Sequence, residues 1–165
     1  MDAIDRKILA ALQQDGRQTN AHLADAIGLS ASATLERVRR LEQDGAIAGY
    51  RAIVAPEALG LSVQALIGVR LRVHARGNIE AFESRVAALR SLVSGFHATG
   101  QFDYVLRVAV RDLRHLREII RVDLAALPGV AKLETMVVLS EVKRDAGWPI
   151  ALERDVESAT ASGGE

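Results

Sequence analysis

Apolar residues recur at helical spacing in the amino-terminal part of the chain, in three segments separated by turn signals. Asp2, Thr19 and Ser30 each precede one of these segments, at the position where a side-chain oxygen can cap a helix. Gly28 and Gly45 follow the second and third segments, where a left-handed residue ends a helix. The pattern therefore predicts three helices, with a tight glycine turn between the second and the third.

The third helix combines an apolar stripe with a polar outward face. Leu35, Val38 and Leu41 form the predicted inward stripe. The residues predicted to project elsewhere are small or charged: Ser32, Ala33, Glu36, Arg37 and Arg40. A helix that enters the major groove needs small side chains for close approach and guanidinium groups that reach guanine edges or phosphates. The pattern is typical of a helix-turn-helix DNA-binding motif, and the alternative is an ordinary helical hairpin with solvated arginines.

A change of pattern after the third helix marks a hinge. The segment Ile47–Val54 has strand character and is either a small wing or the start of a linker, which the sequence leaves open. Pro56 disfavours helix before it, and Gly60 permits a change of direction. We therefore predict a DNA-binding domain with a hinge strand over residues 1–60.

From Val63 onward the apolar residues alternate with other residues, which predicts a strand with one apolar face. A helix capped by Asn78, two strands joined by an antiparallel hairpin, a helix capped by Asp112 and a last strand from Val130 to Val142 follow. The order β-α-β-β-α-β is that of the ferredoxin-like fold. We expect an α+β protein: a winged-helix-like helix-turn-helix domain, a ferredoxin-like domain over residues 61–145, and a partly disordered tail over residues 146–165.

In this fold both helices cover one face of the sheet, so the other face needs a partner. Leu66 and Gly68 lie on that face, and its burial against a second copy would contribute about 25 cal/mol per Å² of apolar area. We therefore expect a homodimer through the sheet. Arg70, Arg72 and Arg107 favour the alternative, a mixed face left in water.

Composition limits the function classes. The 165 residues are 49% hydrophobic, which suits packed domains, and 21 basic residues balance 21 acidic ones. Zero net charge argues against nonspecific DNA coating, so affinity must come from a local patch and from multivalency. The chain has no cysteine, and we find no signal peptide pattern or membrane-spanning apolar run. We expect a cytoplasmic, nucleoid-associated protein without membrane contact.

The sequence shows no catalytic or metal-binding motif. Gln101-Phe102 stands where a phosphate-binding loop requires lysine and a hydroxyl residue, and there is no G-x-S-x-G motif. The four histidines do not show the H-E-x-x-H spacing of zinc sites. We therefore expect no enzymatic activity, no metal and no cofactor.

Several collinear motifs resemble the Lrp/AsnC family, the leucine-responsive or feast/famine regulators. They lie between about Asp2 and Lys143, in the following order: Ile4-Asp5, Ile8-Leu9, Gly28-Leu29-Ser30, Leu35 to Glu42, Gly49-Tyr50, Gly100 with Phe102-Asp103-Tyr104, Leu127-Pro128-Gly129-Val130, and Val137 to Lys143. The resemblance implies a transcriptional regulator that forms dimers and higher oligomers, often octamers. It also implies that a small molecule, usually an amino acid, modulates the protein.

The resemblance implies that the third helix enters the major groove of double-stranded DNA. The candidate contacts on or beside it are Ser30, Ser32, Thr34, Arg37 and Arg40. The two arginines are the strongest candidates, since bidentate pairing to guanine gives about 1–3 kcal/mol of discrimination, although phosphate contact is the competing role. Ala31 and Ala33 stand where many members have proline, so a relative's base preference does not transfer.

In this family the effector lies between neighbouring dimers, beside the loop that joins the two middle strands. The matching positions are His97, Thr99, Gly100, Gln101, Phe102, Asp103, Tyr104, Val137 and Val138. Exposed N–H groups of a glycine-containing loop suit an α-carboxylate, and Asp103 either accepts from an α-ammonium or holds the loop. His97 either contacts the ligand or is hydrogen-bonded at a sheet edge.

One enzymatic alternative comes from the same resemblance. Decarboxylases that act on sirohaem are similar to this family in both domains. In such an enzyme His97, Arg107 and Arg111 would face an acidic tetrapyrrole. The arginines on the outward face of the third helix favour DNA binding instead.

Overall fold

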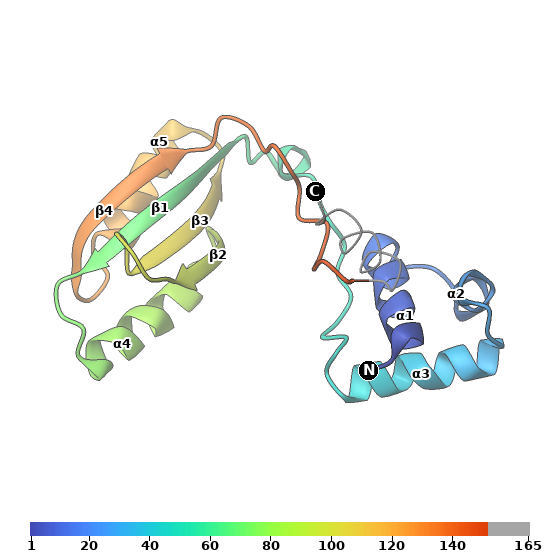
Figure 1. Cartoon of the computed structure of the whole chain (residues 1–165). Helices are drawn as coiled ribbons and strands as arrows, with labels where there is room; N and C mark the ends of the chain where they lie inside the picture. Colours follow the sequence, from blue (N-terminus) through green and yellow to red (C-terminus); the bar gives the residue numbers. More distant parts are fainter. Residues whose placement is uncertain (152–165) are drawn as a thin grey trace, which may run out of the picture. The chain divides into compact units, whose positions relative to one another are not determined.

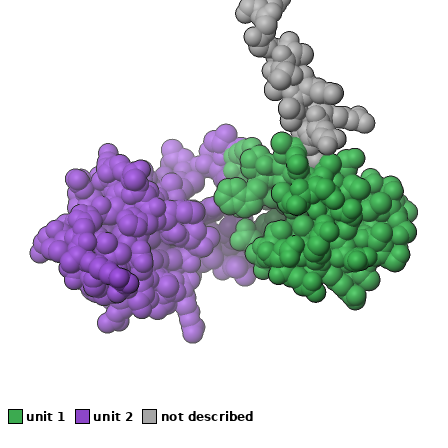
Figure 2. Space-filling model, turned by 60° about the horizontal axis from the view of Figure 1, so that its bottom comes forward, with its two compact units in different colours: residues 1–53, 143–165 green, residues 54–142 purple. Residues whose placement is uncertain are grey.

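The computed structural model describes residues 1–151, which form two compact units (Figures 1 and 2). Unit 1 contains residues 1–53 together with the chain from residue 143 on, and unit 2 contains residues 54–142. Unit 1 thus ends before the expected hinge, because the short 3₁₀ turn η1 (Pro56–Leu59) groups with unit 2. Of the expected tail, residues 146–151 belong to unit 1, whereas residues 152–165 lie outside the described residues.

Unit 1 contains the three helices that the sequence predicts: α1 (Ala3–Gln14), α2 (Asn20–Ile27) and α3 (Ala31–Gln43). The side chains of Asp2, Thr19 and Ser30 accept hydrogen bonds from the first turns of these helices, which confirms the three predicted caps. Gly28 ends α2 in the left-handed conformation, with φ 75°. The helix-turn-helix arrangement of α2 and α3 is therefore present (Figure 1).

The core of unit 1 corrects the predicted inward face of α3. Val38 and Leu41 are buried against Ile8 and Leu23, as the stripe predicts. Thr34 is fully buried, whereas Leu35 is only half-buried. The Thr34 hydroxyl can enter the core because it donates a hydrogen bond of 3.0 Å to the Ser30 carbonyl oxygen.

Of the two alternatives for Ile47–Val54, a small wing or the start of a linker, the structure agrees with the linker, and the hinge strand is not formed. Residues 48–55 have no regular secondary structure. An extended segment becomes a strand only when a neighbour takes up its N–H and C=O groups. The sheet of the described residues contains only β1 to β4, and the segment pairs with none of them.

Unit 2 is an antiparallel sheet of order β2-β3-β1-β4 with its helices on one face (Figure 1). Its elements are β1 (Val63–Leu71), α4 (Arg76–Ala87), β2 (Leu92–His97), β3 (Tyr104–Val110), α5 (Leu113–Glu118), the π-helical turn η2 (Ile119–Leu124) and β4 (Val130–Val137). Phe82, Leu116 and Leu124 pack on the core face of the strands. The predicted ferredoxin-like order and the α+β class are confirmed.

Two expected element boundaries in unit 2 need correction. Helix α4 begins at Arg76 after Ala75, which makes no side-chain cap, so Asn78 lies inside the helix instead of capping it. The last strand ends at Val137, before the expected Val142. The predicted cap Asp112 is confirmed, since its carboxylate accepts from the His115 N–H at 2.7 Å.

The uncovered face of the sheet carries large apolar side chains in the described residues of this single chain. Leu66 on β1 pairs with Met136 on β4, and Phe96 on β2 pairs with Val105 on β3, all on the face away from the helices. Phe96 is 62% exposed and Met136 is 41% exposed. This apolar surface remains to be covered.

The return segment after β4 is fixed to α1. The Gln13 side-chain amide donates to the Trp148 carbonyl oxygen at 2.9 Å and accepts from the Trp148 N–H at 2.6 Å. Gly147 has φ 91°, a backbone conformation that favours glycine, and a Cβ there would displace the Gln13 side chain. The described part of the expected tail therefore contacts the first helix.

Gly68 provides a direct test of packing on the uncovered face. A Cβ at Gly68 would lie 2.7 Å from ring atoms of Phe102, so Gly68→Ala must displace that ring. We expect a loss of about 1–3 kcal/mol in the free energy of unfolding, measured by urea denaturation. Gly77→Ala in α4 is the matched control, because no atom lies within 4 Å and a helical glycine costs about 0.5–1 kcal/mol relative to alanine. Equal stability of Gly68→Ala and the parent would contradict the packing.

Candidate nucleic-acid interface and effector loop

The candidate residues in the first turn of α3 have different environments. Ser30 caps the helix by accepting from the Ala33 N–H at 3.2 Å, and its hydroxyl lies 3.2 Å from that of Ser32. Ser32 is exposed on the outward face. Thr34, a predicted DNA contact, is instead a core residue with 0% exposure, so its contribution is to the packing of α3.

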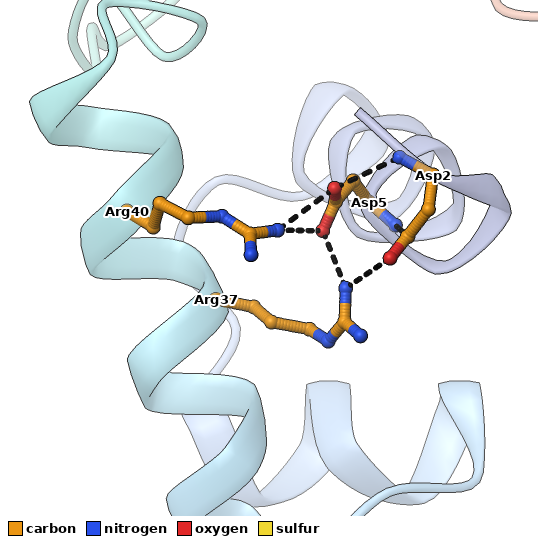
Figure 3. Close-up of polar contacts among 4 residues, drawn as sticks. All are labelled: Asp2, Asp5, Arg37 and Arg40. Atoms are coloured by element: carbon orange, nitrogen blue, oxygen red, sulfur yellow. Dashed lines mark hydrogen bonds and ion pairs between the residues drawn. The ribbon is translucent and has the colours of Figure 1, made fainter.

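Both candidate arginines of α3 reach the amino-terminal turn of α1 (Figure 3). Nη1 of Arg37 donates to Asp2 Oδ2 at 2.7 Å and to Asp5 Oδ1 at 2.8 Å. Nη2 of Arg40 lies 2.9 Å from each oxygen of the Asp5 carboxylate. The side chains of Arg37 and Arg40 are 26% and 52% exposed. These arginines are thus paired with carboxylates, and Arg37 is the more enclosed of the two.

The Asp5 carboxylate is buried, and both of its oxygens accept hydrogen bonds. Besides the two arginines, the Asp2 N–H donates to Asp5 Oδ2 at 2.9 Å, so each oxygen has two donors. Burial alone would raise the pKa of Asp5. The hydrogen bonds from Asp2 and Arg37 outweigh it, and the pKa of Asp5 is lowered. The carboxylate therefore stays charged among its donors.

Asp2 completes a capping box with Asp5. Asp2 Oδ1 accepts from the Asp5 N–H at 2.8 Å, while the Asp5 carboxylate accepts from the Asp2 N–H. The sequence predicts Asp2 only as a helix cap and predicts no contact for Asp5. The spacing of three residues between two carboxylates at a helix start is the signal that marks the box. No local pattern shows that the box binds α3.

The loop between β2 and β3 is held against β1. The Ala98 N–H donates to the Asp103 carbonyl oxygen at 3.0 Å, and the Asp103 N–H donates to the Val69 carbonyl oxygen at 2.9 Å. Thr99, Gly100 and Gln101 are exposed at the tip. The tip therefore presents backbone groups on a base that is hydrogen-bonded to the sheet.

The Asp103 side chain is part of that base. Its Oδ2 accepts from the Leu71 N–H at 2.7 Å, and its Oδ1 lies 2.9 Å from His74 Nε2. The Leu71 N–H and then His74 lower the pKa of Asp103. Of the two roles that the sequence left open, this geometry favours the one in which Asp103 holds the loop. His74 carried no signal in the sequence because its partner lies 29 positions away.

His97 and Tyr104 lie on the helix-covered face of the sheet. Their rings stack with centroids 4.5 Å apart, and the Tyr104 hydroxyl donates to Glu83 of α4 at 2.8 Å. Burial, followed by Glu83, raises the pKa of Tyr104 to about 12. A cavity of about 360 Å³ lies here, lined by Glu83, His97 and Tyr104 and by aliphatic residues that include Val86, Leu89 and Leu92.

The other effector candidates lie elsewhere on unit 2. Phe102 covers Gly68 on the uncovered face. Val137 pairs with Ala65 on β1, whereas Tyr104 pairs with Val69 farther along that strand, about 13 Å away at 3.3 Å per residue. The Val138 N–H donates to the Gln64 carbonyl oxygen at 2.9 Å. The structure of one chain therefore does not bring Val137 and Val138 to the loop.

The residues of the enzymatic alternative are also separated. His97 pairs with Tyr104 on the helix-covered face, whereas Arg107 projects from the other face, where it donates to Gln64 and Glu141. Within residues 1–151, no group of three histidines and carboxylates is placed to hold a metal ion. Over the same range, no helix is both long and apolar enough to cross a membrane.

The capping box predicts how unit 1 responds to acid. Hydrogen bonds from the Asp5 N–H and Arg37 lower the pKa of Asp2 from its ordinary 3.8 to about 2. A carboxylate with a lowered pKa stabilises the fold above its ordinary pKa, and this contribution is lost as the pH falls through the folded value. We therefore expect the free energy of unfolding to fall between pH values of about 4 and about 2. Asp2→Asn, which keeps a capping side chain, should flatten the curve in urea titrations; an unchanged curve would contradict the assignment.

Two family comparisons cover both units of the chain. Residues 1–42 match the AsnC-type helix-turn-helix domain, and residues 64–148 match the Lrp/AsnC ligand binding domain. Leucine-responsive regulatory proteins of Escherichia coli and Haemophilus influenzae are each 40% identical to the chain, over 144 and 147 residues. Each match covers 87% of this chain, with 88% of the Escherichia coli protein and 87% of the Haemophilus influenzae protein.

Solved structures agree with the sequence matches. A Neisseria meningitidis transcriptional regulator in complex with L-Met superposes with a TM-score of 0.86 and 34% identity, covering 90% of this chain and 96% of the other. Escherichia coli AsnC superposes with a TM-score of 0.79 and 26% identity, covering 87% and 95%. The fold, the order of the two domains and the sequence identity together show that this chain belongs to the Lrp/AsnC family of transcriptional regulators.

Proposed function

We propose that the chain is a transcriptional regulator that binds specific sites in double-stranded DNA through α3, and that a small molecule, an amino acid, modulates it. The observation that carries the DNA-binding part is the capped α2–α3 pair, whose left-handed turn at Gly28 leaves the polar face of α3 exposed. The relatives support it, since they are named regulators and one solved structure is a complex with L-Met. We assign the chain no catalytic role.

The exposed side of α3 defines the proposed DNA contacts. Ser32 stands in the first turn, where a short side chain permits close approach to base edges. Arg40 is half-exposed and is proposed as the main cationic contact. Ser30 and Arg37 belong to the same surface, Ser30 chiefly as the cap of α3 and Arg37 chiefly as a link to α1. Thr34 supports α3 from the core.

The uncovered face of the sheet is proposed as the homodimer interface. Leu66, Phe96, Val105 and Met136 form its apolar part, and burying them removes surface worth about 25 cal/mol per Å². Arg107 does not oppose this, because Gln64 and Glu141 already accept its hydrogen bonds. Dimers then assemble further, with octamers as the proposed final state, and pairs of α3 helices read half-sites about one DNA turn apart.

The effector site is proposed to form between copies of the chain. The loop tip of Thr99, Gly100 and Gln101 offers backbone N–H groups to the carboxylate of an amino acid. Phe102, Asp103, His97 and Tyr104 shape and support this region, and Val137 and Val138 reach it only from another copy. An effector can shift only an equilibrium between assemblies for which its affinities differ. The protein would act in the cytoplasm, at the nucleoid.

Ser32→Asp tests whether α3 faces DNA. An acidic residue in the first turn of a helix interacts favourably with the helix dipole, so the variant should still fold. The new charge would face phosphates, and we expect at least about tenfold weaker binding to a selected DNA site, measured by fluorescence anisotropy. Ser84→Asp, at an exposed position of α4, is the control and should bind like the parent. Parental affinity of Ser32→Asp would exclude this face of α3.

Thermal shifts with the twenty amino acids test the effector site. A ligand at a hundredfold excess over its dissociation constant adds about 2.7 kcal/mol to apparent stability. We expect one or a few amino acids to stabilise the parent, and Asp103→Ala to reduce the shift because the loop loses its bonds to Leu71 and His74. Asp15→Ala, exposed in unit 1, should keep the full shift. A shift that survives Asp103→Ala unchanged would place the effector elsewhere.

A further inference from the structure

Arg40 has N–H groups that no residue in the described range 1–151 accepts from. Among the described residues, its hydrogen bonds all leave from Nη2, which faces both oxygens of Asp5. The Nε and Nη1 groups remain as donors on a side chain that is 52% exposed. A guanidinium is planar and rigid, so holding Nη2 limits the directions in which the Nε–H and Nη1–H groups point.

Asp5 is suited to hold Nη2 of Arg40 in place. Its side chain is 2% exposed and has donors on both oxygens, so it cannot turn toward solvent without losing several charge-assisted hydrogen bonds. Arg37 and the Asp2 N–H hold the carboxylate from the other sides (Figure 3). The carboxylate is thus a rigid support beneath Arg40.

The position of Arg40 on α3 indicates which part of DNA it meets. Residues near the amino end of a recognition helix contact base edges, and contacts farther along the element are mostly to the phosphate backbone. Arg40 is in the last turn of α3, whereas Ser32 is in the first. A phosphate oxygen accepts well from a single charged N–H group of a guanidinium, and the Nε–H and Nη1–H groups of Arg40 point in different directions, so one of them is the proposed donor.

We propose that Asp5 is a positioning residue for DNA binding: it holds Arg40 so that a remaining N–H group of the guanidinium, on Nε or Nη1, donates to a DNA phosphate. Arg37 then acts as a brace that keeps Asp5 in place and is not itself the main DNA contact. This inference rests on the proposed DNA-binding function. The charge of the Asp5 carboxylate alone would repel DNA. In this proposal the carboxylate nevertheless favours DNA binding.

The sign of that effect separates positioning from simple electrostatics. Asp5→Asn removes a negative charge from the DNA-binding unit, and Coulomb repulsion alone predicts equal or tighter DNA binding. Positioning predicts weaker binding, because Arg40 keeps its charge but loses its fixed direction. Asp25→Asn, at an exposed position of α2, removes the same charge without touching Arg40 and is the matched control.

The experiment uses the full chain and a duplex that the parent protein selects from random DNA, with anisotropy measured across a salt series. We expect Arg40→Ala to weaken binding about tenfold and to lower the slope of log affinity against log salt by about 0.9, the loss of one phosphate contact. Asp5→Asn should weaken binding about fivefold to tenfold at one salt concentration. Asp25→Asn should bind at least as tightly as the parent.

A double variant tests whether Asp5 acts through Arg40. If it does, adding Arg40→Ala to Asp5→Asn should cost less than about twofold more. Additive losses, or an Asp5→Asn variant that binds as tightly as Asp25→Asn, would overturn the proposal. Circular dichroism checks that each variant is folded.

Arg40→Lys gives an independent readout that keeps Asp5 and the charge intact. A lysine ammonium has three donors that rotate about the Cε–Nζ bond, so a hydrogen bond to Asp5 does not fix the direction of the donor that would face a phosphate. We expect its affinity to match that of Arg40→Ala within about twofold, and parental affinity would overturn the proposal. If the parent protein shows no preference for any duplex over random DNA, the proposed function fails, and the inference fails with it. If the parent selects a site and the Asp5→Asn variant binds that site as tightly as Asp25→Asn does, only the inference is refuted.

Discussion

A buried carboxylate needs hydrogen-bond donors in place of the water it has lost, and in this protein that requirement joins the first helix to the recognition helix. Asp5 takes its donors from its own helix start and from two arginines of α3. Leaving such a group partly unpaired costs several kilocalories per mole, about 3–5 for a broken buried ion pair. The orientation of α3 on α1 therefore depends on this cluster as well as on the apolar contacts of Ile8, Val38 and Leu41.

The second unit follows a different constraint, the need to cover two faces of one sheet. The helices satisfy one face, and the other carries the Gly68–Phe102 contact and exposed apolar residues. The loop that Asp103 holds lies at one end of β1, and Val137 lies toward the other. A single copy of this unit thus leaves one face of its sheet open and its candidate ligand residues apart. We propose that other copies of the chain cover the face and complete the ligand site.

Local signals explain what the sequence could predict. Helix caps such as Asp2, Thr19 and Asp112 act within three residues, and the alternation along β1 reports its own burial. The partners of Arg37 and Arg40 lie 32 to 35 positions away, and the sequence gives no register between α1 and α3. Thr34 is predicted as a DNA contact but lies in the core, because its hydroxyl hydrogen-bonds to the Ser30 carbonyl oxygen at the start of its own helix. The segment Ile47–Val54 has strand propensity, but pairing decides whether a strand forms.

The central claim is that α3 is a DNA-recognition helix held in place by the Asp2–Asp5–Arg37–Arg40 cluster. A crystal structure of the protein on a duplex selected from random sequence tests it most directly. The account predicts α3 in the major groove, Ser32 facing bases, and Arg40 bonded at once to Asp5 and to a phosphate. A complex in which another element enters the groove, or in which Arg40 leaves Asp5 to bind DNA, would contradict it.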